Sequence, residues 1–164
     1  MSVKFVTVKV KDNLVYGLEI DKGIINLSDN FPEWPTLKEV IENNGFEKLF
    51  NASEGKEVTY LNGSYSYHIP IPKPEKIICV GINYPDRNEE YNDGQSIPKN
   101  MSLFVRFARS FVGHNISVIR PKISEQLDYE GEVAIIIGKT GRHIEQKNAY
   151  DYISAISICN EGTI

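Results

Sequence analysis

Three prolines alternate with other residues in the segment 69–74, which reads Ile-Pro-Ile-Pro-Lys-Pro. Proline lacks a backbone N–H and has a fixed φ, so this segment cannot lie inside a helix or in a central strand. Its composition is that of an extended linker. The sequence therefore predicts a boundary between two domains, residues 1–70 and residues 71–164, in a chain of 164 residues.

The residues before the linker predict a small α/β domain. Three short apolar, β-branched runs separated by turn residues have the pattern of a three-stranded meander. The runs are 3–10, 14–20 and 24–27. Thr36 and Glu39 have the spacing of a capping box, and Gly45 lies where a short helix would end. Asn62-Gly63 is typical of a hairpin turn. Because these residues offer no convergent chemistry, we expect a cap or dimerisation domain without catalytic residues.

Short strands dominate the prediction for the residues after the linker. Five apolar runs are separated by Gly, Pro or polar residues, and the segment 148–153 has a helical pattern. The runs are 76–80, 103–106, 117–119, 132–137 and 155–159. The runs 76–80 and 132–137 are so apolar that we expect buried strands. Strands and helices do not alternate as in βαβ units, so the predicted fold class is α+β, mostly β.

Composition and charge exclude several classes of partner. The chain has 18 Lys and Arg against 22 Asp and Glu, a formal net charge of -4, and a nucleic-acid-binding surface needs positive charge. No apolar run approaches the ~20 residues of a membrane span, and the N-terminus lacks the apolar block of a signal peptide. Cys79 and Cys159 lie in apolar runs and are expected to be buried thiols. We therefore expect a cytoplasmic protein without a nucleic-acid or membrane partner.

Two carboxylates precede the most apolar run of the chain. Side chains two residues apart on a strand share a face, so Glu130 and Glu132 are expected to point the same way. Two ionised carboxylates held together repel each other unless a cation lies between them, and carboxylate oxygens suit a hard divalent ion such as Mg²⁺, Mn²⁺ or Ca²⁺. Glu161 follows another strand-like run and is a third candidate ligand. The alternative for Glu130 and Glu132 is a solvent-facing edge of the strand, and the alternative for Glu161 is a strand-end acid facing water.

A loop between two predicted strands carries further candidate site residues. Asn83 and Tyr84 offer neutral hydrogen bonds. Arg87 and Glu90 have the i, i+3 spacing of an ion pair on a helical turn. Such a loop can place a base or an ion pair over a ligand, and the alternative is a surface loop with scattered charges.

The histidines predict neither a zinc site nor a catalytic triad. His68, His114 and His143 lie in separate contexts, without His-x-x-x-His spacing or a nearby cysteine pair. The chain also lacks a Gly-x-Ser-x-Gly elbow, a P-loop and a dinucleotide fingerprint. Only His114 is kept as a candidate pocket residue.

Residues 72–164 resemble the fumarylacetoacetate hydrolase family. The order and spacing of several motifs agree with the family pattern. These motifs are Ile77-Ile-Cys-Val-Gly-Ile-Asn-Tyr84, Leu103-Phe104 with Arg106, Val112-Gly113, Pro121, Leu127-Asp-Tyr-Glu-Gly-Glu132, Ile136-Ile-Gly-Lys139, Ala149 to Tyr152 and Cys159-Asn-Glu161. The resemblance implies a mixed β-roll, of which this chain contains a part, and usually a homodimer.

The resemblance also implies a metal and a substrate class. Family members bind one Mg²⁺, Mn²⁺ or Ca²⁺ through three carboxylates, which by position are Glu130, Glu132 and Glu161. They act on small-molecule 2-oxo acids, acylpyruvates and related enolisable diacids, in some members during the catabolism of aromatic compounds. We therefore expect a divalent-metal-dependent hydrolase that cleaves a C–C bond. The alternatives are isomerisation or decarboxylation of a substrate of the 2-hydroxyhepta-2,4-diene-1,7-dioate type, ligand binding without turnover, and a truncated inactive remnant.

Several features depart from the family pattern. Arg87 stands where many members have a His that activates water together with the acid at Glu90. Since Arg stays protonated, it is expected to hold a substrate carboxylate, while Glu90 moves protons. Glu161 stands where many members have Asp, and Arg106 replaces a frequent Lys and is expected to stabilise an oxyanion. Family members continue well past residue 164, so we expect a cap domain and roughly the first half of a catalytic domain.

Overall fold

The computed structural model describes residues 3–84, 94 and 99–164. The candidate site residues Arg87 and Glu90 lie outside this range. No described helix is both long enough and apolar enough to cross a membrane.

The chain forms two compact units. The first contains Met1–Ile71 together with Gly113–Ile164, and the second contains Pro72–Val112. The division into domains 1–70 and 71–164 stays a prediction.

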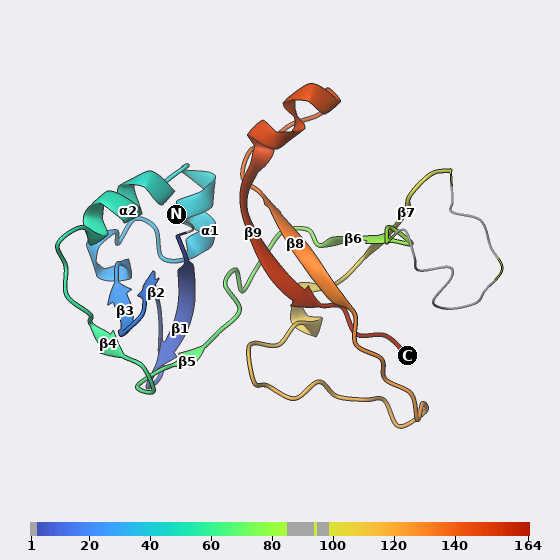
Figure 1. The fold of residues 1–164 in the computed structure, drawn as a ribbon, viewed down its shortest axis with the longest axis horizontal. Helices are drawn as coiled ribbons and strands as arrows, with labels where there is room; N and C mark the ends of the chain where they lie inside the picture. The colour runs from blue at the N-terminus through green and yellow to red at the C-terminus, as the bar shows by residue number, and fades with distance from the viewer. Residues whose placement is uncertain (1–2, 85–93, 95–98) are drawn as a thin grey trace. The chain divides into compact units, whose positions relative to one another are not determined.

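The N-terminal part of the first unit is a five-stranded antiparallel sheet with the order β4-β3-β2-β1-β5 (Figure 1). The strands are β1 (Phe5–Val10), β2 (Asn13–Ile20), β3 (Gly23–Asn26), β4 (Tyr60–Leu61) and β5 (Ser66–Tyr67). The predicted meander is confirmed as β1 to β3. Strands β2 and β3 approach so closely that a Cβ at Gly17 would lie 2.1 Å from the carbonyl oxygen of Ile25, so only glycine fits there.

Strands β4 and β5 flank Asn62-Gly63 but do not form a hairpin. Gly63 has a φ of 87°, which a tight turn commonly requires. However, β4 pairs with β3 at one edge of the sheet, and β5 pairs with β1 at the other. The predicted hairpin is therefore wrong, because each flanking strand finds its partner at a different edge.

Short helices pack against this sheet and complete its core. They are η1 (Ser28–Asn30, a 3-10 turn), α1 (Leu37–Glu42) and α2 (Phe46–Ser53). The predicted capping box begins α1: Thr36 Oγ1 accepts the N–H of Lys38 at 3.1 Å, and Glu39 accepts the N–H of Thr36 at 2.9 Å. Helix α2 is not predicted from the sequence, because its apolar spacing extends over only 8 residues. The core cluster consists of Tyr16, Leu18, Ile25, Leu27, Trp34, Leu37, Val40 and Leu49.

Among its described residues, the second unit contains one antiparallel strand pair, β6 (Ile78–Gly81) with β7 (Ser102–Val105), followed by the 3-10 turn η2 (Ala108–Ser110). These strands confirm the runs predicted at 76–80 and 103–106. No residue of β6 is buried, contrary to the prediction, because one strand pair is too small to cover its own faces.

The other part of the first unit is a long hairpin. Its elements are β8 (Gly131–Ile137), the 3-10 helix η3 (Gln146–Tyr152) and β9 (Ile153–Asn160). They confirm the strands predicted at 132–137 and 155–159 and the helical pattern before the second strand. A register shift between Ile136 and Ile137 marks a β-bulge near the end of β8.

Three further expectations from the sequence are wrong. Residues 117–119 form no strand. Strand β8 is not buried: exposed and half-buried side chains alternate along its whole length. Both cysteines are half-buried rather than buried, and neither forms a disulfide. Across the described residues, the fold is α+β and mostly β, as predicted.

Candidate functional site

The ladder between β8 and β9 continues beyond both strands toward the candidate metal ligands. Gly131 pairs with Asn160 within the ladder. Further out, Asp128 and Thr163 exchange two backbone hydrogen bonds of 2.9 and 3.1 Å. Both pairs follow one register, because each step back from Gly131 corresponds to one step forward from Asn160. The segments that carry the candidate ligands are therefore held as one antiparallel ribbon.

This register places the three candidate carboxylates on one face. Glu130 lies opposite Glu161, whose backbone N–H donates to the carbonyl oxygen of Glu130 at 2.8 Å. Glu132 lies two residues further along and opposite Cys159. Directly opposite residues, and residues two apart on one strand, share a face of an antiparallel ladder. The structure thus brings Glu161 to the face that Glu130 and Glu132 share.

Glu161 is the most buried of the three carboxylates. It is 8% exposed, and after Ser53 no other described residue is buried. Glu130 and Glu132 are half-buried. Burying an ionised carboxylate is costly unless hydrogen bonds or a cation compensate. The alternative that Glu161 is a strand-end acid facing water is therefore wrong.

Asn160 fixes the backbone at the site. Its Oδ1 accepts the N–H of Glu130 at 2.9 Å, across the end of the ladder. This role of Asn160 is not predicted from the sequence, where Asn160 belongs to the motif Cys159-Asn-Glu161. The available signal was its position directly before Glu161 at the end of an apolar run.

The three carboxylates share a face without closing into a ligand cluster. Within residues 3–84, 94 and 99–164, no group of three or more His, Cys, Asp or Glu residues is placed to hold a metal ion. The donor set itself fits a hard divalent cation, because it offers three carboxylates on one ladder face. The assignment of Glu130, Glu132 and Glu161 as metal ligands stays a prediction.

Asn83 and Tyr84 follow β6 in the second unit. Ile82 precedes them with a φ of 58°, a left-handed conformation that a β-branched residue rarely adopts. The chain therefore changes direction immediately before Asn83. Tyr84 is exposed. The substrate-binding roles of Asn83 and Tyr84 stay predictions.

Arg106 follows β7 in the same unit. Its backbone N–H donates to the carbonyl oxygen of Ile77 at 3.2 Å, and its guanidinium lies 5.2 Å from the centroid of the Phe104 ring. This cation–π contact helps to hold the charged group in place. The catalytic role of Arg106 stays a prediction, as do those of Arg87 and Glu90, which lie outside the described residues.

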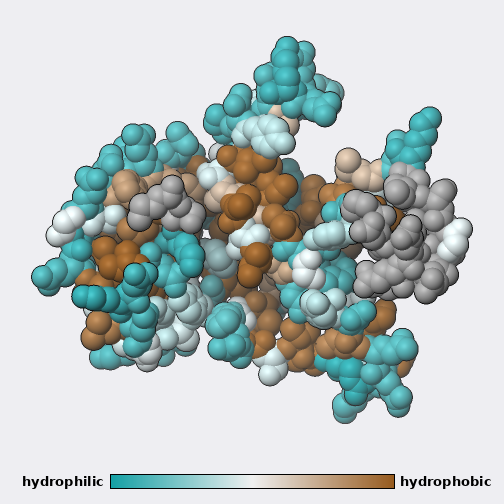
Figure 2. Space-filling view, in the orientation of Figure 1, coloured by the Kyte–Doolittle hydropathy of each residue, from teal (hydrophilic) through white to brown (hydrophobic). Residues whose placement is uncertain are grey.

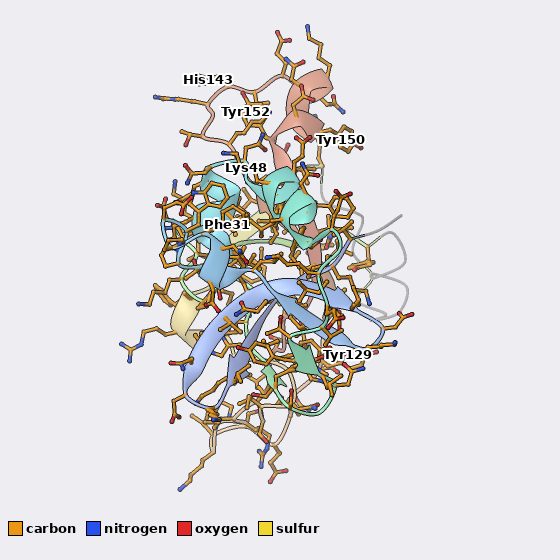
Figure 3. All side chains as sticks on the ribbon, turned by 90° about the vertical axis from the view of Figure 1, so that its left-hand side faces the viewer. Phe31, Lys48, Tyr129, His143, Tyr150 and Tyr152 are labelled. Carbon is orange, nitrogen blue, oxygen red and sulfur yellow. The ribbon has the colours of Figure 1, made fainter. Side chains whose placement is uncertain are left out.

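His114 lies against the N-terminal sheet. Its ring meets the ring of Tyr67 in β5 edge to face, with the centroids 5.6 Å apart. The Tyr67 hydroxyl donates to Glu19, and this hydrogen bond is the largest cause of the raised pKa of Tyr67. His143 lies toward the opposite end of the hairpin from Tyr129 and the candidate carboxylates (Figure 3). The substrate-binding role of His114 stays a prediction.

Comparison with known proteins places this chain in a family. Residues 76–164 match the family model described as fumarylacetoacetate (FAA) hydrolase C-terminal. The mitochondrial oxaloacetate tautomerase Fahd2a of Rattus norvegicus is 38% identical over 152 residues, which cover 88% of this chain and 47% of the rat protein.

Solved structures share the fold. Fumarylacetoacetate hydrolase from Exiguobacterium antarcticum is 28% identical with a TM-score of 0.74, covering 99% of this chain and 56% of that chain. Maleylpyruvate hydrolase from Sphingobium sp. SYK-6, solved with manganese(II) and pyruvate, is 20% identical with a TM-score of 0.76, covering 97% of this chain and 58% of that chain. At 20% identity, the likeness to maleylpyruvate hydrolase shows a shared fold and nothing more.

The matches to the curated tautomerases include 88% of this chain. They cover only about half of the length of those relatives, 46–47%. The fold of this chain corresponds to part of the fold of the solved structures. This confirms a small N-terminal α/β cap, followed in the sequence by a partial β-roll of this type. Because the family model matches more than half of its residues, the chain belongs to the fumarylacetoacetate hydrolase family.

Proposed function

We propose that this chain carries the metal site of an enzyme that acts on small 2-oxo dicarboxylates. The observation that carries the proposal is the register that sets Glu130 opposite Glu161, with Glu132 on the same face. Carboxylates arranged in this way repel one another, and their burial is costly, so a divalent cation would relieve both effects. Glu130, Glu132 and Glu161 would hold Mg²⁺, Mn²⁺ or Ca²⁺.

The bound metal would supply Lewis-acid stabilisation of negative charge on the oxygens of a 2-oxo acid. The residues of the chain would bind the substrate and move protons around it. Arg106 carries a fixed positive charge suited to a substrate carboxylate or an oxyanion, and Arg87 is proposed to bind a second carboxylate. Asn83 and Tyr84 would donate hydrogen bonds to the substrate, and Glu90 would transfer a proton.

Keto–enol tautomerisation is the first reaction that we infer. The rat relative is named an oxaloacetate tautomerase, and its match covers most of this chain. The reaction moves a proton between carbon and oxygen and needs no activated water. Arg87 stands where many family members have the His that activates water, and a guanidinium stays protonated. The chemistry of this position therefore favours tautomerisation over hydrolysis.

Hydrolytic C–C cleavage of an acylpyruvate is the second candidate. It is the reaction expected from the sequence, and the Exiguobacterium antarcticum structure carries the name of a hydrolase. Isomerisation, after loss of a proton, and decarboxylation, after loss of CO₂, both pass through an enolate, and both reactions stay alternatives within the family. Assembly as a homodimer stays a prediction.

The test follows the loss of enol absorbance of oxaloacetate and of an acylpyruvate, with Mg²⁺ or Mn²⁺ and with a metal-only blank. We expect metal-dependent acceleration with oxaloacetate that Glu132→Gln abolishes. Glu125→Gln is the matched control, because Glu125 is an exposed acid of the same segment. Pyruvate release from the acylpyruvate would instead identify hydrolysis. Turnover unchanged by Glu132→Gln would contradict the proposed site, and metal binding without turnover would identify a binding protein.

A further inference from the structure

The backbone ladder is irregular at Glu130 and Glu161. Residues directly opposite each other in an antiparallel ladder exchange both of their N–H···O bonds or neither. Asp128 and Thr163 exchange both, at 2.9 and 3.1 Å. Glu161 donates its N–H to the carbonyl oxygen of Glu130 at 2.8 Å, but the N–H of Glu130 donates to Oδ1 of Asn160 at 2.9 Å. A side chain therefore takes the place of one ladder bond between these two candidate ligands.

The irregularity is confined to this pair. Regular strand pairing ends where β8 begins at Gly131 and β9 ends at Asn160, and it resumes as the bridge between Asp128 and Thr163. Between these two points, the Glu130 backbone is held by one backbone bond and one bond to a side-chain amide. The position of Glu130 relative to Glu161 therefore depends on Asn160 and not on the ladder spacing alone.

The position of Asn160 in its strand has no explanation in packing. In β8 and β9, both described throughout, every exposed residue except Asn160 is apolar or glycine. Figure 2 shows hydrophobic residues gathered over these strands. Asparagine is also depleted in strands, so neither the strand nor the character of its face favours this residue. The hydrogen bond to the Glu130 N–H is the feature that distinguishes an amide here from an apolar side chain of similar size.

We propose that Asn160 is a positioning residue of the metal site. Its Oδ1 holds the Glu130 backbone so that the carboxylates of Glu130 and Glu161 reach one ion together. Asn160 acts through Glu130 and is not itself a ligand. Groups that orient metal ligands through hydrogen bonds typically change metal affinity about 10- to 100-fold. The inference rests on the proposed function, because it assumes that these carboxylates bind a divalent ion.

The first test measures the Mn²⁺ affinity of the full chain by calorimetry. Asn160→Leu keeps the size of the side chain and removes the acceptor, so it should weaken binding at least about tenfold, as should Asn160→Ala. Asn160→Asp keeps an acceptor and should restore the affinity. Asn148→Leu is the matched control at an exposed asparagine of η3, and it should change the affinity less than about twofold. Circular dichroism checks that each variant is folded.

The second test measures positioning without any metal, because Asp at position 160 also adds a charge. Hydrogen exchange of the Glu130 amide is followed by nuclear magnetic resonance. Asn160→Leu should speed this exchange at least about tenfold, and Asn160→Asp should return it to the rate of the unaltered chain. The amide of Ala134, which pairs with Ser157 within the ladder, should exchange at the same rate in all variants.

Two results would overturn the inference alone. One is unchanged exchange at Glu130 in folded Asn160→Leu. The other is unchanged Mn²⁺ affinity in that variant, which would leave the metal site standing. An unaltered chain that binds no Mn²⁺ would instead contradict the proposed function, and the inference with it.

Discussion

The N-terminal sheet and the β8–β9 hairpin are both antiparallel, yet only the N-terminal sheet has a core. All the buried apolar side chains that the structure describes lie between Val8 and Leu49. After Ser53, the one described residue that is buried is Glu161, a carboxylate. Helices α1 and α2 supply a second layer for the first sheet. On the hairpin, by contrast, the apolar side chains of one face are exposed, namely Val133, Ile135, Ile137, Ile156 and Ile158.

The difference shows that apolar strand sequence does not by itself produce burial. β8 is as apolar as any strand of the N-terminal sheet, but a strand is buried only when another layer packs on it. The N-terminal sheet finds that layer within about fifty residues of its own sequence. The hairpin holds its register through backbone hydrogen bonds and one half-buried face, whereas the side chains of its other face are exposed.

The largest loss of stability is expected from a substitution that disrupts the N-terminal core. Leu49 in α2 is fully buried against the core, so Leu49→Ala should lower the free energy of unfolding by about 2–5 kcal/mol. Urea unfolding followed by the fluorescence of Trp34, the single tryptophan, reports on this core directly. Phe50→Ala, at an exposed neighbour in the same helix, is the control and should cost much less. Equal losses for the two variants would contradict a core centred on Leu49.

The second effect is a pH dependence that belongs to the N-terminal core. Tyr16 donates its hydroxyl hydrogen to the carbonyl oxygen of Trp34 at 2.8 Å. Burial, with smaller contributions from the charges of Glu33 and Glu39, raises the pKa of Tyr16 to about 12. In the unfolded chain tyrosine ionises near pH ~10. The contribution of Tyr16 to stability is therefore present below about pH 10 and is lost as the pH rises toward 12, by about 2–3 kcal/mol.

Tyr16→Phe tests this dependence. Unfolding free energies measured between pH 9 and 12, a window set by the ionisation of tyrosine near ~10, should fall less steeply for Tyr16→Phe than for the unaltered chain. Parallel curves for the two proteins would show that another group causes the loss.

A smaller effect concerns the start of α1, which helps to close the N-terminal core. Thr36→Ala removes the hydroxyl that accepts the N–H of Lys38 and should lower stability by about 1 kcal/mol. Thr36→Ser keeps an acceptor and should restore most of the loss. Thermal unfolding by circular dichroism measures both, and a Ser variant no better than the Ala variant would argue against the capping role.

The smallest expected effect lies on the hairpin. Ile135 in β8 is 56% exposed, so Ile135→Ala should change the stability of this chain by no more than about 0.5 kcal/mol. Hydrogen exchange of the β8 and β9 amides measures this locally. A large loss in this chain would mean that the two regions do not differ in packing as described.

Features encoded by neighbouring residues could be predicted from the sequence. The meander and the capping box of Thr36 and Glu39 depend on alternation and on i, i+3 spacing, and both are confirmed. Features that depend on distant partners could not be predicted. The strands beside Asn62-Gly63 pair at opposite sheet edges, and β8 lacks the layer that its composition suggested.

The same distinction between local and long-range features applies to the candidate site. That Glu130 and Glu132 share a face follows from their spacing alone. That Glu161 lies opposite Glu130 depends on the register between strands joined by a long connection, which no local pattern encodes. The hydrogen bond from the Glu130 N–H to Asn160 depends on that register as well.

Calorimetric titration of the full chain with Mn²⁺ tests most directly whether one face of the β8–β9 ladder holds a divalent metal. We expect binding of one equivalent, lost in Glu130→Gln and Glu161→Gln and unchanged in Glu125→Gln, with circular dichroism confirming that each variant is folded. One-site binding that persists with unchanged affinity in folded Glu130→Gln and Glu161→Gln would contradict a metal site on this face.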